Sequence, residues 1–220
     1  RAKIIRPMMV RFSTIEAMMA TMNMIITPFG ISTPGISFEI VLSGDFDLVG
    51  GGAYEFVPNF RERYLAELTE GKRIGRKLRV VAACGNGTAG AFAPQALERI
   101  GCEVIPLDVE LDHTFPHYNP NPEDMEMLHA IRDKVLETGA DVGLGFDGDG
   151  DRCGVVDNTG REIFADKVGV MLARDISAIH PNSVFVVDVK STGLFMTDQV
   201  LKDQGARTDY WKTGHSYIKR

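Results

Sequence analysis

The chain has 220 residues, of which 44% are hydrophobic and 25% are charged, a composition typical of a globular protein with one or two cores. Its formal net charge of −6 argues against nucleic acid or an acidic membrane as a general partner. The sequence has no run of about 18 apolar residues that would predict a membrane span. Three widely spaced cysteines, Cys84, Cys102 and Cys153, suit neither a disulfide framework nor a zinc site. We therefore expect reduced thiols and a cytoplasmic protein.

The first 42 residues show poor periodicity and contain six of the ten methionines, so they predict no regular element. Gly50–Gly52 is typical of a flexible joint. Apolar residues then recur at helical spacing from Phe60 to Leu68, and Gly71 is placed to end that helix. The basic run up to Lys77 indicates a linker into a new domain.

From residue 78 onward, apolar runs alternate with helical patterns. Strands are predicted at 78–84, 103–107, 141–146, 153–157 and 183–189. Helices are predicted at 88–100, 122–138, 166–179 and in the stretch that ends near 204. Thr88 is placed to cap the first of these helices, and Asn121, followed by Pro122, is placed to cap the second.

This alternation of strands and helices predicts mostly parallel sheets covered by helices. We therefore expect an α/β protein built from successive three-layer α/β/α domains with mixed, mostly parallel sheets. The predicted domain boundaries give residues 1–74, 75–163 and 164–220.

The clearest candidate site is the segment Asp147-Gly148-Asp149-Gly150-Asp151-Arg152, which follows a predicted strand. Ligands of open α/β sheets bind at the carboxyl ends of strands. The two glycines permit a tight backbone on which three carboxylates converge. Two unit charges about 5 Å apart repel by about 3 kcal/mol at an effective dielectric of about 20, and a hard divalent cation removes that cost. The pattern therefore predicts a Mg²⁺ site formed by Asp147, Asp149 and Asp151, with Arg152 beside it to hold a phosphate.

The acidic loop has two other interpretations, a solvated turn and a calcium EF-hand. A solvated turn accounts for an isolated Asp-Gly-Asp, but less well for three acids directly after an apolar strand. The EF-hand pattern fails because Arg152 stands where a glycine is needed and Asn158 stands where a bidentate glutamate is needed.

Several segments resemble the α-D-phosphohexomutases, the family of phosphoglucomutase and phosphomannomutase. The resemblance runs from about Asp45 to Arg220 and is nearest to the bifunctional phosphomannomutase/phosphoglucomutase branch. The segments that carry it are Cys84–Gly90, Pro120–Pro122, Ala140–Asp141, Phe146–Arg152, Asp188–Thr192 and Thr213–Lys219.

The resemblance implies an enzyme of four domains that interconverts hexose 1-phosphate and hexose 6-phosphate. A phosphoserine in the first domain gives its phosphoryl group to the sugar, and the enzyme then takes back the other phosphate of the bisphosphate. The resemblance also implies that residues 1–74 are a remnant of the first domain, that 75–163 are the second domain with the metal loop, and that 164–220 are part of the third.

The same resemblance implies the cofactor, the substrate and the site residues. Mg²⁺ would bind the three aspartates together with the phosphoserine, and the partner would be mannose or glucose phosphate, with no nucleic acid and no membrane. Either Lys190 or His215 would assist proton transfer or neutralise charge. The implied catalytic residues are Arg152, Lys190 and His215, and the implied substrate-binding residues are Arg152, Lys190, Gly214, His215 and Ser216.

The sequence departs from the family pattern at the catalytic serine. The family's phosphoserine lies in a Thr-x-Ser-His-Asn type motif, and no Ser-His pair occurs in this chain. We hypothesise that residues 1–42 are divergent or read from a shifted frame. The chain also stops before the family's sugar-reading loop and fourth domain, so we expect an internal fragment with little or no mutase activity. Neither the preferred sugar nor the oligomeric state follows from the sequence.

Three other functions stay open on the sequence alone. Gly85–Gly90 satisfies the G-x-G-x-x-G pattern between a strand and a helix, and Asp108 ends the next strand, as in a dinucleotide-binding oxidoreductase. That function leaves the acidic loop unexplained. A Mg²⁺-dependent phosphatase would also use an Asp-x-Asp loop, although usually after the first strand of its domain and not the third. A non-catalytic domain that binds a sugar phosphate would retain the metal loop.

Overall fold

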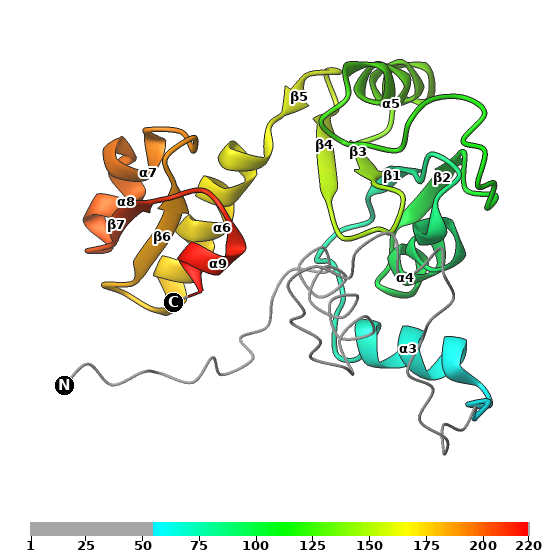
Figure 1. Ribbon diagram of the computed structural model, residues 1–220, viewed down its shortest axis with the longest axis horizontal. Coiled ribbons are helices and arrows are strands. Elements are labelled where there is room, and N and C mark those ends of the chain that lie inside the picture. Colours follow the sequence, from blue (N-terminus) through cyan, green and yellow to red (C-terminus); the bar gives the residue numbers. More distant parts are fainter. Residues whose placement is uncertain (1–54, 220) are drawn as a thin grey trace, which may run out of the picture. The chain divides into compact units, whose positions relative to one another are not determined.

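The structure is a computed structural model that describes residues 55–219 (Figure 1). The expectations for residues 1–42 and for the joint at Gly50–Gly52 lie outside the described residues. The chain divides into two compact units between Arg73 and Ile74. Within the described range, every helix is too short or too polar to cross a membrane.

Helix α3, Phe60–Thr69, precedes this division. It forms where the periodicity predicts it, and its Tyr64, Leu65 and Leu68 are buried on one face. Gly71 follows the helix with a φ of 65°, a left-handed conformation that glycine adopts without steric cost. The predicted helix end is therefore confirmed.

The larger sheet contains five strands in the order β2-β1-β3-β4-β5 (Figure 1). These strands are β1 Arg79–Ala83, β2 Glu103–Leu107, β3 Val142–Phe146, β4 Cys153–Asp157 and β5 Glu162–Ile163. Strand β1 pairs in parallel with β2 and β3, whereas β4 pairs antiparallel with β3 and β5. The sheet is mixed because the chain reverses at the acidic loop between β3 and β4.

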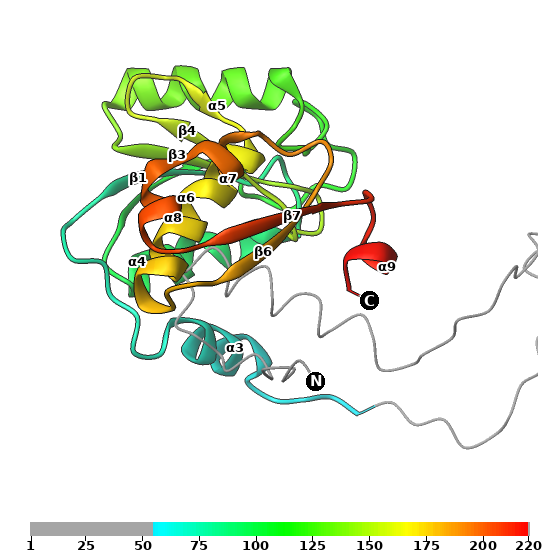
Figure 2. The same ribbon diagram turned by 90° about the vertical axis from the view of Figure 1, so that its left-hand side faces the viewer.

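Helices cover both faces of this sheet (Figures 1 and 2). Helix α5, Met125–Thr138, lies on one face, where Ile131 and Val135 join Val81 and Val156 of the sheet in one core. Helix α4, Ala93–Arg99, lies on the other face. The three layers predicted from the alternation of strands and helices are present here.

The helix predicted from Thr88 is divided into two. Thr88–Ala91 forms a 3₁₀ helix, η1, and α4 begins after it. A continuous α-helix fails here because Pro94 has no N–H and its ring would clash with the carbonyl four residues earlier. The predicted cap is also wrong, because the Thr88 hydroxyl donates to the carbonyl of Gly148 at 3.2 Å.

The helix predicted from Pro122 begins later, at Met125. Asp124 is its N-cap, and the Asp124 carboxylate accepts the N–H of Glu126 at 2.9 Å. Asn121 instead forms a separate turn. Proline suits a turn as well as the first turn of a helix, which explains why the sequence places the cap three residues too early.

A second, smaller sheet pairs β6 Val184–Asp188 with β7 Arg207–Trp211 in parallel. Three helices pack on one face of it, α6 Ala165–Ile179, α7 Leu194–Thr197 and α8 Gln199–Asp203. Their buried apolar side chains are Val170, Ala173, Phe195 and Leu201. On the opposite face, Val184 and Val186 are about half exposed. Among the described residues, the helices therefore cover one face of this sheet.

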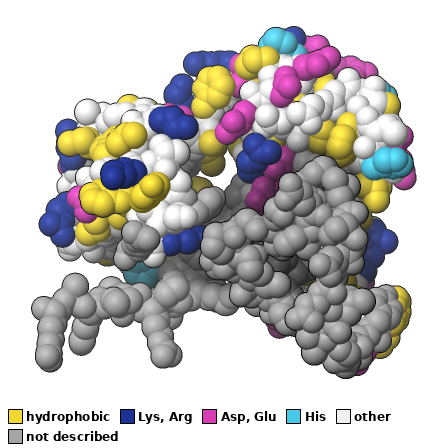
Figure 3. All heavy atoms as spheres, in the orientation of Figure 1, with side chains coloured by type: hydrophobic (Ala, Val, Ile, Leu, Met, Phe, Trp, Pro, Cys, Tyr) yellow, Lys and Arg dark blue, Asp and Glu magenta, His cyan; other side chains and the backbone are white. Residues whose placement is uncertain are grey.

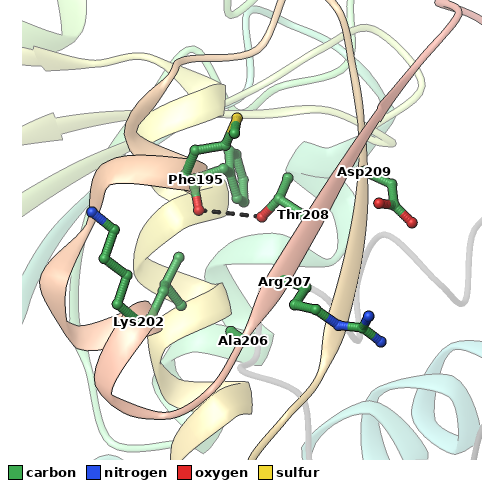
Figure 4. A pocket seen from close by; sticks show the side chains of 8 residues that line it. Phe195, Lys202, Ala206, Arg207, Thr208 and Asp209 are labelled. Atoms are coloured by element: carbon green, nitrogen blue, oxygen red, sulfur yellow. Dashed lines mark hydrogen bonds between the residues drawn. The ribbon is translucent and has the colours of Figure 1, made fainter.

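A cavity of about 330 Å³ lies beside α7, α8 and β7 (Figure 4). Phe195 forms part of its apolar lining, while Lys202 and Arg207 contribute charged side chains. The Thr208 hydroxyl donates to the Phe195 carbonyl at 3.2 Å, as the dashed line in Figure 4 marks. None of the predicted metal-binding or catalytic residues lines this cavity.

Asp198 divides the helix predicted to end near residue 204. It follows α7, and its side chain accepts the N–H of Leu201 at 3.1 Å to cap α8. Arg174 of α6 donates from Nε to both Asp198 carboxylate oxygens at 3.1 Å. The hydrogen bonds from Arg174 outweigh burial and lower the pKa of Asp198.

We expect acid to weaken this junction. The unfolded carboxyl has a pKa of about 3.9 and the folded pKa is lower, so the unfolded chain binds more protons and stability rises with pH. The contribution of Asp198 is fully present above the unfolded pKa and is lost as the pH falls through the folded pKa. Urea midpoints at several pH values between 6 and 3 measure this. Asp198→Asn should lower the urea midpoint at pH 6 and make the midpoint depend less on pH. If the midpoints of the unchanged chain and the variant fall equally steeply toward pH 3, the assignment to Asp198 is wrong.

Candidate metal centre

Residues 147–152 form the hairpin loop between β3 and β4. Phe146 at the end of β3 pairs directly with Cys153 at the start of β4. Within the loop, the Gly150 N–H donates to the Asp147 carbonyl at 3.0 Å, and Gly150 has a φ of 76°. The positive φ requires a residue such as glycine, and it folds the loop back on itself.

The three predicted ligands come together on this loop. One carboxylate oxygen from each of Asp147, Asp149 and Asp151 lies within 4.8 Å of the others. Oxygens on opposite sides of one ion lie about 4.2 Å apart around Mg²⁺ and about 4.8 Å apart around Ca²⁺. The spacing therefore admits one divalent cation, with a slight closure for Mg²⁺. No other such group of three acids, histidines or cysteines occurs within residues 55–219.

The three carboxylates differ in their surroundings. Asp147 is 2% exposed, whereas Asp149 and Asp151 are exposed. Burial acts to raise the pKa of Asp147, but hydrogen bonds from the backbone and side chain of Arg152 outweigh it and lower that pKa. Burial, together with hydrogen bonding to and repulsion by Asp147, raises the pKa of Asp151. Arg152 thus neutralises Asp147 but leaves repulsion between the carboxylates, which a bound cation would offset.

Arg152 is fixed at two points beside the triad. Its Nε donates to Asp147 Oδ2 at 2.6 Å, and its Nη1 donates to Asn121 Oδ1 at 3.2 Å. The side chain is still 52% exposed, and Nη2 donates to none of the described residues. Nη2 is therefore available for a phosphate oxygen. Asn121, which the sequence predicts only as a helix cap, thus contacts the arginine beside the triad.

The other predicted site residues lie in the turn after β6 and in the segment around the start of α9. Lys190 is exposed in the turn after β6. Gly214 has a φ of 125° and precedes α9, His215–Ile218, on which Ser216 is exposed. No hydrogen bond or ion pair between described residues links these loops to residues 147–152. Their convergence on one substrate stays a prediction.

Asp188 joins the two loops that carry these residues. Its carboxylate accepts the Lys190 N–H at 2.9 Å and the Ser191 hydroxyl at 3.1 Å, and Thr213 also donates to it. Burial acts to raise the pKa of Asp188, but these hydrogen bonds lower it. Asp188 belongs to a segment that resembles the family, yet no pattern in the sequence singles it out.

The glycine loop 85–90 has four of its six N–H groups, those of residues 86, 87, 88 and 90, hydrogen-bonded within the protein. The Gly87 N–H donates to the Cys84 carbonyl at 2.7 Å, and the Thr88 N–H donates to the Gly148 carbonyl at 3.0 Å. A dinucleotide site needs such N–H groups free at a helix N-terminus to hold the pyrophosphate. The geometry therefore disfavours the oxidoreductase alternative. The acidic loop also follows β3 and not the first strand, unlike the usual arrangement in the phosphatase alternative.

Basic and acidic side chains form ion pairs with one another on the described surface outside the triad. Acidic and basic side chains are interspersed on the face shown in Figure 3. The ion pairs include Arg76 with Asp141 at 3.3 Å and Lys77 with Glu103 at 2.8 Å. The basic residues of the predicted linker are thus partly neutralised by neighbouring acids.

Known proteins are similar to this chain. Residues 62–160 match the family model described as phosphoglucomutase/phosphomannomutase, α/β/α domain II. A phosphomannomutase/phosphoglucomutase of Pseudomonas putida is 45% identical over 159 residues, which are 72% of this chain and 34% of that protein. The chain belongs to the phosphoglucomutase/phosphomannomutase family.

This chain is also similar to other members of the phosphoglucomutase/phosphomannomutase family. A phosphomannomutase/phosphoglucomutase of Pseudomonas aeruginosa is 41% identical over 175 residues, 79% of this chain and 37% of that protein. A solved family structure from Burkholderia thailandensis superposes with a TM-score of 0.73 at 32% identity, covering 83% of this chain and 39% of that one. The chain spans about a third of the length of the curated relatives it matches. The resemblance and the mixed α/β fold are thereby confirmed.

Proposed function

We propose that this chain carries the metal-binding part of a Mg²⁺-dependent phosphohexomutase. The supporting observation is the convergence of three carboxylates on loop 147–152, in a chain whose relatives are named phosphomannomutase/phosphoglucomutase. The reaction is the interconversion of hexose 1-phosphate and hexose 6-phosphate, with mannose and glucose phosphates as substrates. It proceeds through a phosphoserine enzyme and a hexose bisphosphate.

The residues of the hairpin loop have separate roles. Mg²⁺ held by Asp147, Asp149 and Asp151 would neutralise charge on the transferring phosphoryl group. Asp147 is the rigid ligand, because it is buried and hydrogen-bonded to Arg152. Arg152 directs its free Nη2 toward a phosphate oxygen, and the two bonds at Nε and Nη1 keep the planar guanidinium oriented.

The loops of the smaller sheet complete the proposed substrate site. Lys190 and His215 transfer a proton or neutralise charge at the sugar hydroxyl that accepts or loses the phosphoryl group. Gly214 and Ser216 bind the substrate through polar backbone and hydroxyl groups. Asp188 supports this assignment, because it connects the turn of Lys190 with the segment that leads into Gly214.

We assign residues 1–74 to the remnant of a first domain, 75–163 to a second domain and 164–220 to part of a third. No Ser-His pair of the family's phosphoserine motif occurs in the 220 residues. The polypeptide of this sequence is therefore proposed to have little mutase activity by itself, and its activity is best tested in a complete relative.

A chimera tests the function. Residues 62–160 of this chain replace the segment they match in the Pseudomonas putida relative, and conversion of mannose 1-phosphate and glucose 1-phosphate is assayed with Mg²⁺. We expect turnover within about tenfold of that relative, because the exchanged segment carries the three converging carboxylates. The same chimera with Asp149→Asn is the matched control and should be inactive. A folded chimera that releases inorganic phosphate without isomerising the sugar would favour the phosphatase, and one with no turnover would contradict the proposal.

A further inference from the structure

The glycine loop 85–90 satisfies a phosphate-binding pattern, yet the N–H groups of Asn86, Gly87, Thr88 and Gly90 bond within the protein. Two of its residues, Asn86 and Thr88, bond instead to other segments of the same unit. The Asn86 N–H donates to the Asp108 carbonyl at 2.7 Å, and the Asn86 carboxamide donates to the Glu110 carbonyl at 2.8 Å. These bonds tie the glycine loop to the start of the segment between β2 and α5.

Thr88 and Gly87 contact the metal loop itself. The Gly148 carbonyl accepts both the N–H of Thr88 at 3.0 Å and its hydroxyl at 3.2 Å. At Gly87, an added Cβ would lie 2.8 Å from the Gly148 oxygen and 2.9 Å from the Gly148 Cα. A side chain does not fit at this distance, so the two backbones approach closely only because residue 87 is glycine.

Gly148 stands between Asp147 and Asp149, two of the proposed ligands. Fixing its carbonyl fixes the peptide plane that leads into Asp149, and so restricts the direction in which that side chain leaves the loop. Asp147 is already held by Arg152. The contact with Thr88 therefore acts on the part of the loop that the Asp147–Arg152 bonds do not hold.

We propose that Gly87 and Thr88 are positioning residues for the metal centre. They hold Gly148 so that the carboxylates are arranged for a cation before it binds, which lowers the entropic cost of binding. This role rests on the proposed function, because it takes Asp147, Asp149 and Asp151 as the ligands. It also gives the G-x-G-x-x-G segment a function that requires no dinucleotide.

Binding of Mn²⁺ to the 220-residue chain, followed by electron paramagnetic resonance, tests the role without any assay of activity. Thr88→Val removes the hydroxyl and keeps the shape, and we expect about two- to tenfold weaker binding, the effect of one hydrogen bond. Thr88→Ser restores the hydroxyl and should bind within about twofold of the unchanged chain. Gly87→Ala displaces Gly148 and should weaken binding at least about tenfold.

Thr159→Val is the matched control. The Thr159 hydroxyl donates to Asp157 at 2.7 Å in the turn between β4 and β5, so its loss removes a similar bond away from the metal loop. Its Mn²⁺ affinity should equal that of the unchanged chain. If Gly87→Ala fails to fold by circular dichroism, the Thr88 variants decide the question.

The outcomes separate the two proposals. If the unchanged chain does not bind Mn²⁺, or if Asp149→Asn binds as tightly, the metal centre itself is wrong. If Asp149→Asn loses binding while folded Thr88→Val and Gly87→Ala bind like the unchanged chain, the positioning role alone is overturned. Equal losses in Thr88→Val and Thr159→Val would also overturn it, because they would indicate a general effect on stability.

Discussion

Asp149→Asn should weaken Mg²⁺ binding to the 220-residue chain at least about 100-fold, which corresponds to about 2.7 kcal/mol. The substitution preserves the size of the side chain and removes one of the three negative charges that face the cation. Asp149 is exposed, so the free energy of unfolding should change by less than about 0.5 kcal/mol in the absence of metal. Isothermal titration calorimetry measures the affinity, and urea unfolding measures the stability.

Replacing Asp149 tests the metal assignment more specifically than replacing Asp147. Asp147 is buried and accepts two hydrogen bonds from Arg152, so its replacement would disturb the loop as well as the charge. Asp175→Asn on α6 serves as the control, because Asp175 is also exposed and lies outside the triad. Competition with Ca²⁺ would show which ion the loop prefers. Equal Mg²⁺ affinity in the Asp149 and Asp175 variants would remove the metal assignment.

Gly145→Ala should destabilise the chain by about 1–3 kcal/mol. Gly145 lies in β3 directly under α5, and an added Cβ would be 2.6 Å from Cδ1 of Ile131 and 3.2 Å from Cε of Met127. Both neighbours are fully buried, so neither has free space into which to move. Urea unfolding measures the loss. Gly75→Ala is the control, because a Cβ added at Gly75 meets no atom within 4 Å.

Ile131→Val provides a rescue for Gly145→Ala, because valine lacks Cδ1. Alone, this substitution should cost about 0.5–1.5 kcal/mol through the cavity it leaves. The double variant should lose less free energy of unfolding than the two single variants lose together, because the new methyl group occupies part of that cavity. Strictly additive losses would mean that Gly145 and Ile131 are not in contact.

The positions of most strands follow from the sequence, because short apolar runs bounded by Gly, Pro or acidic residues are typical of buried strands. Strand β7 was not predicted, since its residues alternate between half-buried and exposed and include Arg207 and Asp209. The helix starts at Thr88 and Pro122 were wrong because each candidate cap had a competing partner. For Thr88 that partner is Gly148, 60 residues later in the chain.

The site was predicted to the extent that it is local. The three aspartates share one loop, so their convergence can be read from six consecutive residues. The hydrogen bond from Arg152 to Asn121 joins residues 31 positions apart, and the contact of Thr88 with Gly148 depends on which strands are neighbours. Such contacts arise only once the sheet order is known, and one sequence does not supply that order.

The pairing of β1 with β3 has a consequence for any attempt to copy this loop. Because the two strands are parallel neighbours, the glycine loop that follows β1 packs against the acidic loop that follows β3. A graft of residues 147–152 onto a foreign hairpin would carry the charged groups but not the glycine loop that supports them. Transplanting the centre therefore requires two separate pieces of chain, together with the strands that bring them to one edge.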